Sequence, residues 1–116
     1  PRSYRAVYEA FPRLKLVMAH LGNGSWRQTK EVADAFPNAL FDTSEITEWH
    51  GAPLAPTPEE LARLIRDIGP ERVMLGTDFP WWSPAHCVQG IMDMPVLSQS
   101  EKEAILGANA ARILGI

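Results

Sequence analysis

Two side chains that can bind a metal ion or transfer a proton follow short apolar runs of the sequence. His20 comes directly after the run 14–19, and Asp78 comes three residues after the run 73–75. A neutral imidazole can ligate a divalent metal and exchanges protons near neutral pH. A carboxylate is also a metal ligand, and its surroundings tune its pKa for acid–base work. The two residues therefore predict metal binding or proton transfer at one shared site.

Each of these residues also has a purely structural explanation. A lone buried histidine is most often a hydrogen-bonded core residue, and an aspartate after a strand often caps the next helix. Ser83 is better placed than Asp78 for such a cap, which favours a functional role for Asp78. For His20 both interpretations stay open from the pattern alone.

Other polar residues carry weaker signals. The segment 42–44, Asp-Thr-Ser, ends a second strand-like run, where short polar side chains commonly satisfy turn amides, and we favour a structural role for it. His50 lies in a long loop that a substrate could reach, but a solvated loop histidine is equally ordinary, and it receives no role. Cys87 falls inside an expected helix and is interpreted as a buried, inert thiol.

An aromatic cluster follows Asp78. Trp81 and Trp82 come after Phe79-Pro80 and can wall a pocket for an apolar or aromatic substrate, pack against the last helices, or form a protein-binding surface. The sequence has no H-E-x-x-H, paired-cysteine, G-x-S-x-G or glycine-rich phosphate motif. The chemistry therefore rests on His20 and Asp78.

The elements that must position these residues alternate between short strands and longer helices. The pattern predicts strands over 14–19, 39–44 and 72–78, and helices over 3–11, 25–36, 57–68, 83–92 and 98–114, with an interruption near residue 107. This alternation favours an α/β fold with a parallel sheet and right-handed crossovers. Ligands gather at the carboxyl ends of such strands, where the sequence places His20, the segment 42–44 and Asp78.

Local signals mark where several helices begin. Proline after Ser83 predicts one start. Residues 45–56 show no steady period and are expected to form a long loop, which is often functional in a compact domain. Capping boxes are expected at Ser25–Gln28, Thr57–Glu60 and Ser98–Glu101.

The composition is that of a globular domain. The chain has 116 residues, 46% of them hydrophobic, a net charge of −3 and one cysteine. The absence of a basic cluster argues against a nucleic-acid partner, and no apolar run approaches the roughly 18 residues of a membrane span. One cysteine and no signal peptide favour a cytoplasmic protein. Because Pro1 rather than Met opens the chain and a helix follows at once, we expect a piece of a longer protein.

Four segments in order along nearly the whole chain resemble the carboxyl-terminal part of the amidohydrolase-related family, which includes aminocarboxymuconate-semialdehyde decarboxylase. They are Leu-Val-Met-Ala-His-Leu-Gly at 16–22, Ala-Leu-Phe-Asp-Thr-Ser at 39–44, Val-Met-Leu-Gly-Thr-Asp-Phe-Pro at 73–80, and Asn-Ala-Ala-Arg-Ile-Leu-Gly at 109–115. The resemblance implies a (β/α)8 TIM barrel with one divalent metal, usually zinc, at the carboxyl ends of its strands. Residues 1–116 would then be a single incomplete domain, a partial barrel of the last three β/α units with parallel strands.

The same resemblance implies roles for the two chemical residues. Asp78 would be the eighth-strand aspartate, which binds the metal and can take a proton from its water. His20 would be the sixth-strand histidine, which donates or accepts a proton beside the metal. The family's His-x-His pair and fifth-strand histidine have no equivalent here, and two ligands cannot hold a catalytic zinc. We therefore expect the chain alone to be inactive without the missing amino-terminal part of the barrel, and its unpaired strand edges to favour association, including homo-oligomers.

These features lead to one main functional hypothesis and two alternatives. The parent protein is expected to be a metal-dependent hydrolase or a non-oxidative decarboxylase of a small carboxylate or carbonyl substrate, with His20 and Asp78 in acid–base and ligand roles. The first alternative is a non-catalytic α/β domain that binds proteins through Trp81 and Trp82. The second is a metal-free lactonase of the same fold.

Overall fold

Three short parallel strands form the centre of the molecule. The structure, a computed structural model, describes residues 1–116. Strand β1 (Val17–Met18) pairs with β2 (Leu40–Asp42), and β2 pairs with β3 (Val73–Met74), both in parallel, in the order β1-β2-β3. The predicted α/β fold with a parallel sheet is therefore confirmed. The strands are shorter than the apolar runs that predicted them, because the ends of those runs pair with no neighbouring strand.

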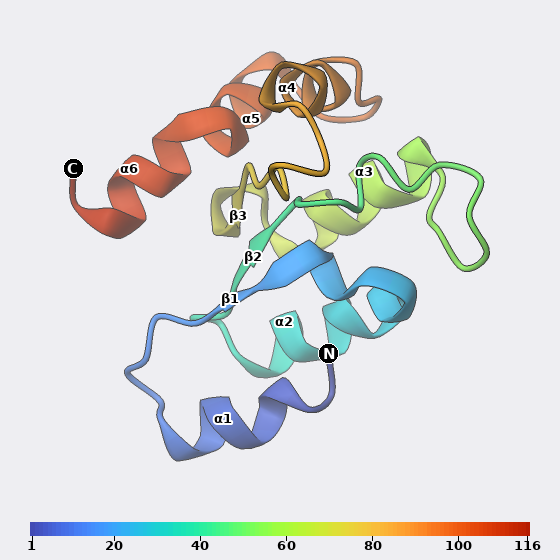
Figure 1. Ribbon diagram of the computed structural model, residues 1–116. Helices are drawn as coiled ribbons and strands as arrows, with labels where there is room; N and C mark the ends of the chain where they lie inside the picture. The colour runs from blue at the N-terminus through green and yellow to red at the C-terminus, as the bar shows by residue number, and fades with distance from the viewer.

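Helices flank the sheet on both sides. Figure 1 shows α1 and α2 next to β1, and α4, α5 and α6 beyond β3. A 3-10 segment (Ala19–Gln28) precedes α2, another (Pro70–Arg72) precedes β3, and a π-helical turn (Ala104–Ala108) joins the last two helices, near the expected interruption. The α-helices are α1 (Tyr4–Ala10), α2 (Thr29–Ala35), α3 (Pro58–Ile68), α4 (Pro84–Met92), α5 (Gln99–Glu103) and α6 (Asn109–Leu114).

Each strand contributes one fully buried apolar residue to the hydrophobic core. Met18 and Val73 both lie in register with Phe41, and all three are fully buried. Helix α3 contributes to the same core the apolar residues that recur at helical spacing, Leu61, Leu64, Ile65 and Ile68, all of which are buried. Each large apolar side chain buried in this way contributes about 1.5–3 kcal/mol. This packing fixes the strands, and with them the residues at their carboxyl ends.

Two of the three expected capping boxes form. The Thr57 hydroxyl accepts a hydrogen bond from the Glu60 amide at 3.1 Å, and the Glu60 carboxylate accepts one from the Thr57 amide at 2.9 Å. Ser98 and Glu101 make the same reciprocal pair at the start of α5. Helix α4 begins at Pro84 after Ser83, as predicted. These helix starts depend on contacts within four residues, so local sequence determines them.

The capping box predicted at Ser25–Gln28 is wrong. The α-helix begins at Thr29, and Ser25 lies inside the irregular 3-10 segment. The Thr29 hydroxyl donates a 2.7 Å hydrogen bond to the carbonyl oxygen of Leu21, eight residues earlier. A tertiary contact at the fully buried Thr29 thus replaces the local cap and lengthens the turn after β1.

The outer sides of the sheet have no strand partner. Both β1 and β3 pair only with β2. Unpaired strand edges expose backbone donors and acceptors that another strand can satisfy. None of the helices combines the length and the apolar character required to cross a lipid bilayer.

Candidate functional site

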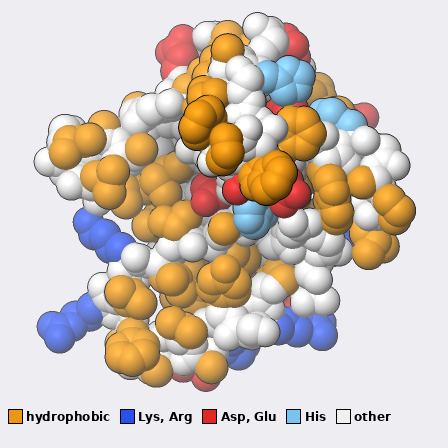
Figure 2. Space-filling view, in the orientation of Figure 1, with side chains coloured by type: hydrophobic (Ala, Val, Ile, Leu, Met, Phe, Trp, Pro, Cys, Tyr) orange, Lys and Arg blue, Asp and Glu red, His pale blue; other side chains and the backbone are white.

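The carboxyl ends of the three strands meet at one edge of the sheet, which we call the strand-end rim (residues 19–23, 42–45 and 76–78). His20 follows β1, Asp42 is the last residue of β2, and Asp78 lies four residues beyond β3. Because the strands are parallel, their carboxyl ends necessarily lie at the same edge. In the orientation of Figure 1, Figure 2 shows acidic, histidine and hydrophobic side chains gathered together on this face.

The turn after β1 has an unusual backbone. His20, Leu21, Gly22 and Asn23 have φ values of 59°, 45°, 88° and 47°. Left-handed backbone is unfavourable for residues with a Cβ atom, and for leucine especially, so tertiary contacts must hold this turn. One of them is a 2.9 Å hydrogen bond that the His20 amide donates to Oδ1 of Asp42.

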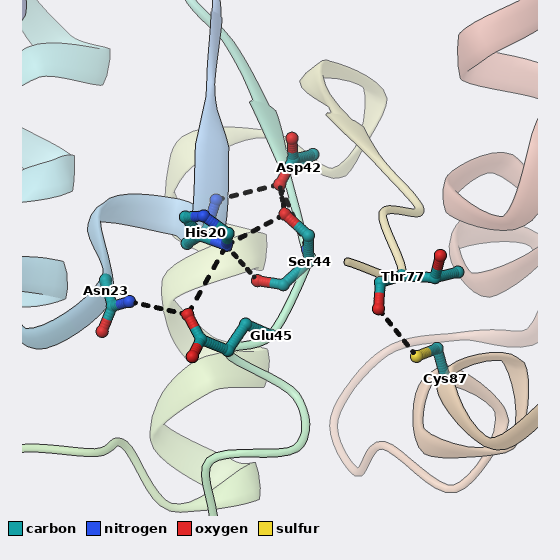
Figure 3. A network of polar contacts seen from close by, with 7 residues as sticks. All are labelled: His20, Asn23, Asp42, Ser44, Glu45, Thr77 and Cys87. Atoms are coloured by element: carbon teal, nitrogen blue, oxygen red, sulfur yellow. Dashed lines mark hydrogen bonds and ion pairs between the residues drawn. The ribbon is translucent and has the colours of Figure 1, made fainter. Parts of the chain in front are cut away.

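Contacts with Ser44 fix the proton on the His20 ring. Nδ1 of His20 lies 2.8 Å from the Ser44 carbonyl oxygen and 3.0 Å from the Ser44 hydroxyl (Figure 3). A carbonyl oxygen only accepts, so Nδ1 carries the hydrogen and the neutral ring presents a bare lone pair on Nε2. The side chain is 30% exposed. His20 is therefore arranged to exchange a proton or bind a ligand through Nε2.

A carboxylate lies close to the same ring nitrogen. Oε2 of Glu45 is 3.9 Å from Nδ1 of His20 and accepts a 2.9 Å hydrogen bond from the Asn23 side-chain amide (Figure 3). Glu45 has φ 61°, which is a strained backbone for a glutamate. From the sequence, Glu45 is expected only to begin the 45–56 loop, and no local pattern predicts this contact.

Asp42 links β1 and β2 at the rim. Its Oδ1 atom accepts hydrogen bonds from the Ser44 amide at 3.1 Å and from the Ser44 hydroxyl at 2.5 Å, besides the one from His20. The expectation that segment 42–44 satisfies turn amides is thus confirmed for Asp42. One of those amides belongs to His20, however, which joins this structural role to the candidate site.

The end of β3 packs directly against the end of β2. A Cβ atom at Gly76 would lie 2.8 Å from Cβ of Ser44 and 2.9 Å from its backbone nitrogen. Those distances are too short for any side chain, so the close approach requires glycine. The Gly76 amide also donates a 3.2 Å hydrogen bond to the Thr43 hydroxyl. The backbone of Gly76, two residues before Asp78, is therefore in contact with Ser44, the residue that binds the His20 ring.

Asp78 is half-buried, and its carboxylate makes no hydrogen bond or ion pair within the chain. Its φ is 55°, and its carbonyl oxygen accepts a 3.0 Å hydrogen bond from the Trp81 amide. A helix cap would require a carboxylate–amide bond, which is lacking, and Ser83 occupies the N-cap position of α4. The structure thus removes the structural explanation for Asp78. That its carboxylate and the His20 ring enter one cavity remains a prediction.

The aromatic residues after Asp78 are mostly open to solvent. Phe79 is 74% and Trp81 is 80% exposed. Of the three roles expected for the aromatic cluster, packing against the last helices is therefore wrong for Trp81. A wall for a substrate and a protein-binding surface both remain compatible with this exposure.

Cys87 behaves as expected of an inert thiol. It is fully buried, and its Sγ lies 3.7 Å from the Thr77 carbonyl oxygen (Figure 3). Burial raises the pKa of the Cys87 thiol, and the neighbouring Glu48 carboxylate raises this pKa further. A neutral thiol is a poor nucleophile and a poor ligand.

A pocket of about 250 Å³ lies beside the rim, between the 45–56 loop, α3 and α4. Its lining includes His50, which is exposed, and Asp93. Within it, Oε2 of the almost fully buried Glu48 lies 2.5 Å from Nε2 of His86, on the first turn of α4. This contact joins residues 38 positions apart, and no sequence motif predicts it. Neither His20 nor Asp78 lines this pocket.

The side chains of this chain do not by themselves form a metal centre. Imidazole and carboxylate are the right donor types for a zinc-like ion, and Asp78 has no competing partner. A catalytic zinc takes three protein ligands, however, and no group of three or more His, Cys, Asp or Glu side chains is arranged to hold a metal. The donor types therefore fit a divalent ion, but the chain supplies fewer donors than such an ion requires.

Comparison with known proteins identifies similar chains. An amidohydrolase family model matches residues 1–116. A 2-amino-3-carboxymuconate-6-semialdehyde decarboxylase from Dictyostelium discoideum is 29% identical over 97% of this chain and 34% of its own length.

Two solved structures share the fold. The 5-carboxyvanillate decarboxylase from Sphingomonas paucimobilis is 27% identical with a TM-score of 0.65, over 95% of this chain and 36% of that one. A dihydroxybenzoic acid decarboxylase from Polaromonas sp. JS666, with bound manganese, is 18% identical with a TM-score of 0.66, over 94% of this chain and 36% of that one. The chain thus spans about a third of the length of these proteins.

Proposed function

The chain belongs to the amidohydrolase family, and on that premise we propose that it supplies the last three β/α units of a (β/α)8 barrel in a metal-dependent, non-oxidative decarboxylase. The parallel order β1-β2-β3 and the gathering of polar residues at its carboxyl ends support this proposal. The unpaired outer sides of β1 and β3 are where the remaining strands of such a barrel would add.

The arrangement of His20 is the observation that carries the proposal. Decarboxylation breaks the bond between a carbon atom and its carboxylate, releases CO2, and places a proton on that carbon. An imidazolium whose Nδ1–H is bound to the Ser44 carbonyl can deliver this proton only from Nε2. The neutral ring that results keeps its orientation, because Nδ1 retains its hydrogen and its contact with the Ser44 carbonyl.

Asp78 is proposed as the second functional residue. Its half-buried carboxylate has no partner within the chain and is therefore available to a ligand from outside it. We propose that Asp78 contributes one ligand to a divalent metal whose other ligands lie in parts of the barrel beyond these residues. The resemblance favours zinc, whereas one structural relative holds manganese, so the ion itself is a question for elemental analysis.

The proposed substrate is a small, unsaturated or aromatic carboxylate. The relatives that are 29% and 27% identical to this chain are named for the decarboxylation of such acids. The exposed rings of Phe79 and Trp81 immediately follow Asp78 and offer flat apolar surface for a conjugated substrate. Hydrolysis of a small carbonyl substrate is the competing reaction that the same residues would support.

The test uses the full-length gene product, loaded separately with zinc and manganese. We expect CO2 release from at least one member of a panel of aromatic and unsaturated carboxylates, and about one equivalent of divalent metal by elemental analysis. Hydrolysis of lactones or amides without CO2 release would replace the decarboxylase with a hydrolase, and activity without metal would indicate the metal-free lactonase. A fully metallated protein that converts none of the carboxylates, lactones or amides contradicts an enzymatic role.

A further inference from the structure

We propose that Asp42 is a positioning residue for His20, acting through its carboxylate oxygen as a hydrogen-bond acceptor and not through its charge. The proposal rests on the proposed function to the extent that His20 is the group that transfers the proton. Asp42 is the last residue of β2, and His20 follows β1, so the contact between them crosses the sheet at the strand-end rim.

The backbone around His20 requires an external restraint. Residues 20–23 all have positive φ values, and only Gly22 adopts such values without steric cost. A chain segment of this kind relaxes to ordinary φ values unless tertiary contacts hold it. The hydrogen bond from the His20 amide to Asp42 acts on the first of these residues, and the bond from Thr29 to the Leu21 carbonyl acts on the second.

Asp42 also orients the atoms that bind the imidazole ring. The Ser44 hydroxyl has a single hydrogen, which it donates to Oδ1 of Asp42. Its lone pairs therefore face Nδ1 of His20, which shares its hydrogen between this hydroxyl and the Ser44 carbonyl. Figure 3 shows the three residues joined in this way. One carboxylate oxygen thus fixes both the backbone and the ring of His20.

The two oxygens of Asp42 are not equivalent, and this gives the inference its test. Oδ1 accepts all three hydrogen bonds, from the His20 amide, the Ser44 amide and the Ser44 hydroxyl, whereas Oδ2 accepts none. Asparagine can keep its carbonyl oxygen at the Oδ1 position and place its amide group where Oδ2 lies. Asp42→Asn therefore preserves the restraint and removes the charge, and Asp42→Ala removes both.

The experiment compares Asp42→Asn and Asp42→Ala in the full-length protein by two readouts. Hydrogen exchange followed by mass spectrometry measures the turn directly: we expect peptides covering residues 19–23 to exchange at least about tenfold faster in Asp42→Ala and at the wild-type rate in Asp42→Asn. Steady-state kinetics should show kcat reduced about 100-fold in Asp42→Ala with KM little changed, and a kcat close to wild type in Asp42→Asn. Asp67→Ala, at an exposed acid of α3, is the matched control.

The outcomes separate positioning from other roles. Equal losses in Asp42→Asn and Asp42→Ala would mean that the charge itself matters and would overturn the inference, as would wild-type exchange and kcat in Asp42→Ala. Ser44→Ala adds a variant that keeps the bond between Asp42 and the His20 amide, and it should leave the exchange of residues 19–23 unchanged while lowering kcat. If that variant loosens the turn as much as Asp42→Ala, Asp42 is not the restraint. A wild-type protein without enzymatic activity would contradict the proposed function alone, because the exchange measurement still decides the positioning.

Discussion

Nδ1 of His20 lies 2.8 Å from the carbonyl oxygen of Ser44, a group that can only accept a hydrogen bond. This contact decides which ring nitrogen carries the proton in the neutral histidine and leaves Nε2 available. A core histidine would have both nitrogens satisfied, whereas this ring is 30% exposed and has partners at one nitrogen only. The relationship therefore favours the chemical interpretation of His20 over the structural one.

Asparagine at position 20 separates the roles of the two ring nitrogens. The asparagine amide can replace the Nδ1–H donor toward Ser44, but His20→Asn has no group at the position of Nε2. We expect this variant to fold and to bind metal like the wild type while kcat falls about 100- to 10,000-fold, the usual contribution of a general acid. Elemental analysis and steady-state kinetics of the full-length protein provide the measurement. A His20→Asn variant that keeps more than a tenth of wild-type kcat would remove His20 from the mechanism.

Asp78→Asn tests the proposed ligand. The amide keeps the size of the side chain but has no charge and is a much weaker donor to a divalent ion. We expect most of the metal and nearly all activity to be lost, with little change in the urea midpoint of unfolding because the Asp78 carboxylate supports no hydrogen bond within the chain. Asp93→Asn, at an exposed acid outside the rim, serves as the control. Full metal content in Asp78→Asn would show that the ligands lie elsewhere.

The sequence predicted those features that depend on neighbouring residues. Thr57 and Glu60 lie three residues apart and form their capping box regardless of the rest of the fold. The parallel order of the strands follows from their alternation with helices. The same local logic failed at Ser25, because the buried hydroxyl of Thr29 binds the Leu21 carbonyl and shifts the helix start.

The parts of the candidate site that the sequence did not predict depend on distant contacts. No pattern identifies a left-handed Leu21, since its φ is maintained by groups on other elements. The shared Oδ1 of Asp42 is a three-dimensional relationship between residues 22 positions apart. The sequence predicted the positions of His20 and Asp78 near strand ends. It did not predict which nitrogen of the His20 ring carries the hydrogen.

Cys87 is expected to react slowly with thiol reagents in the folded protein. Burial, and then the neighbouring Glu48 carboxylate, raise the pKa of this thiol above its ordinary value of 9.0. At pH 8 the reactive thiolate is therefore scarcer than in the unfolded chain, and we expect labelling of the peptide that contains Cys87 to accelerate at least about tenfold on unfolding in urea. Mass spectrometry after timed alkylation measures the rate. Equally fast labelling with and without urea would contradict the burial of this side chain.

The capping boxes predict a loss of stability in acid. Hydrogen bonds from the Thr57 amide to Glu60, and from the Ser98 amide to Glu101, hold the pKa of each carboxyl below its ordinary value of 4.5. A carboxyl whose pKa is lower in the folded state stabilises the fold above the unfolded-state pKa, and this stabilisation disappears as the pH falls through the folded-state value. The urea midpoint should therefore fall below about pH 4.5, and Glu60→Gln should weaken this dependence. A midpoint whose pH dependence between 3 and 6 is the same in Glu60→Gln would remove Glu60 as a contributor.

Removing His86 should destabilise the protein more than neutralising its partner Glu48. The Glu48 side chain is 3% exposed and that of His86 is 66% exposed, so the two partners differ in their access to water. His86→Ala leaves a buried carboxylate whose remaining partners, the Thr47 hydroxyl at 3.1 Å and the Cys87 thiol, carry no charge. Such an uncompensated buried group costs about 1–3 kcal/mol or more. In Glu48→Gln the exposed imidazole is solvated and the amide can still accept its hydrogen bond, so we expect a loss below about 1 kcal/mol. Urea unfolding of both variants at pH 7 measures the difference, with Gln89→Ala as an exposed control on the same helix. A larger loss of unfolding free energy in Glu48→Gln than in His86→Ala would contradict this prediction. It would mean that the charge of Glu48, and not its burial, determines how α4, the helix after the segment that carries Asp78, is held against the 45–56 loop.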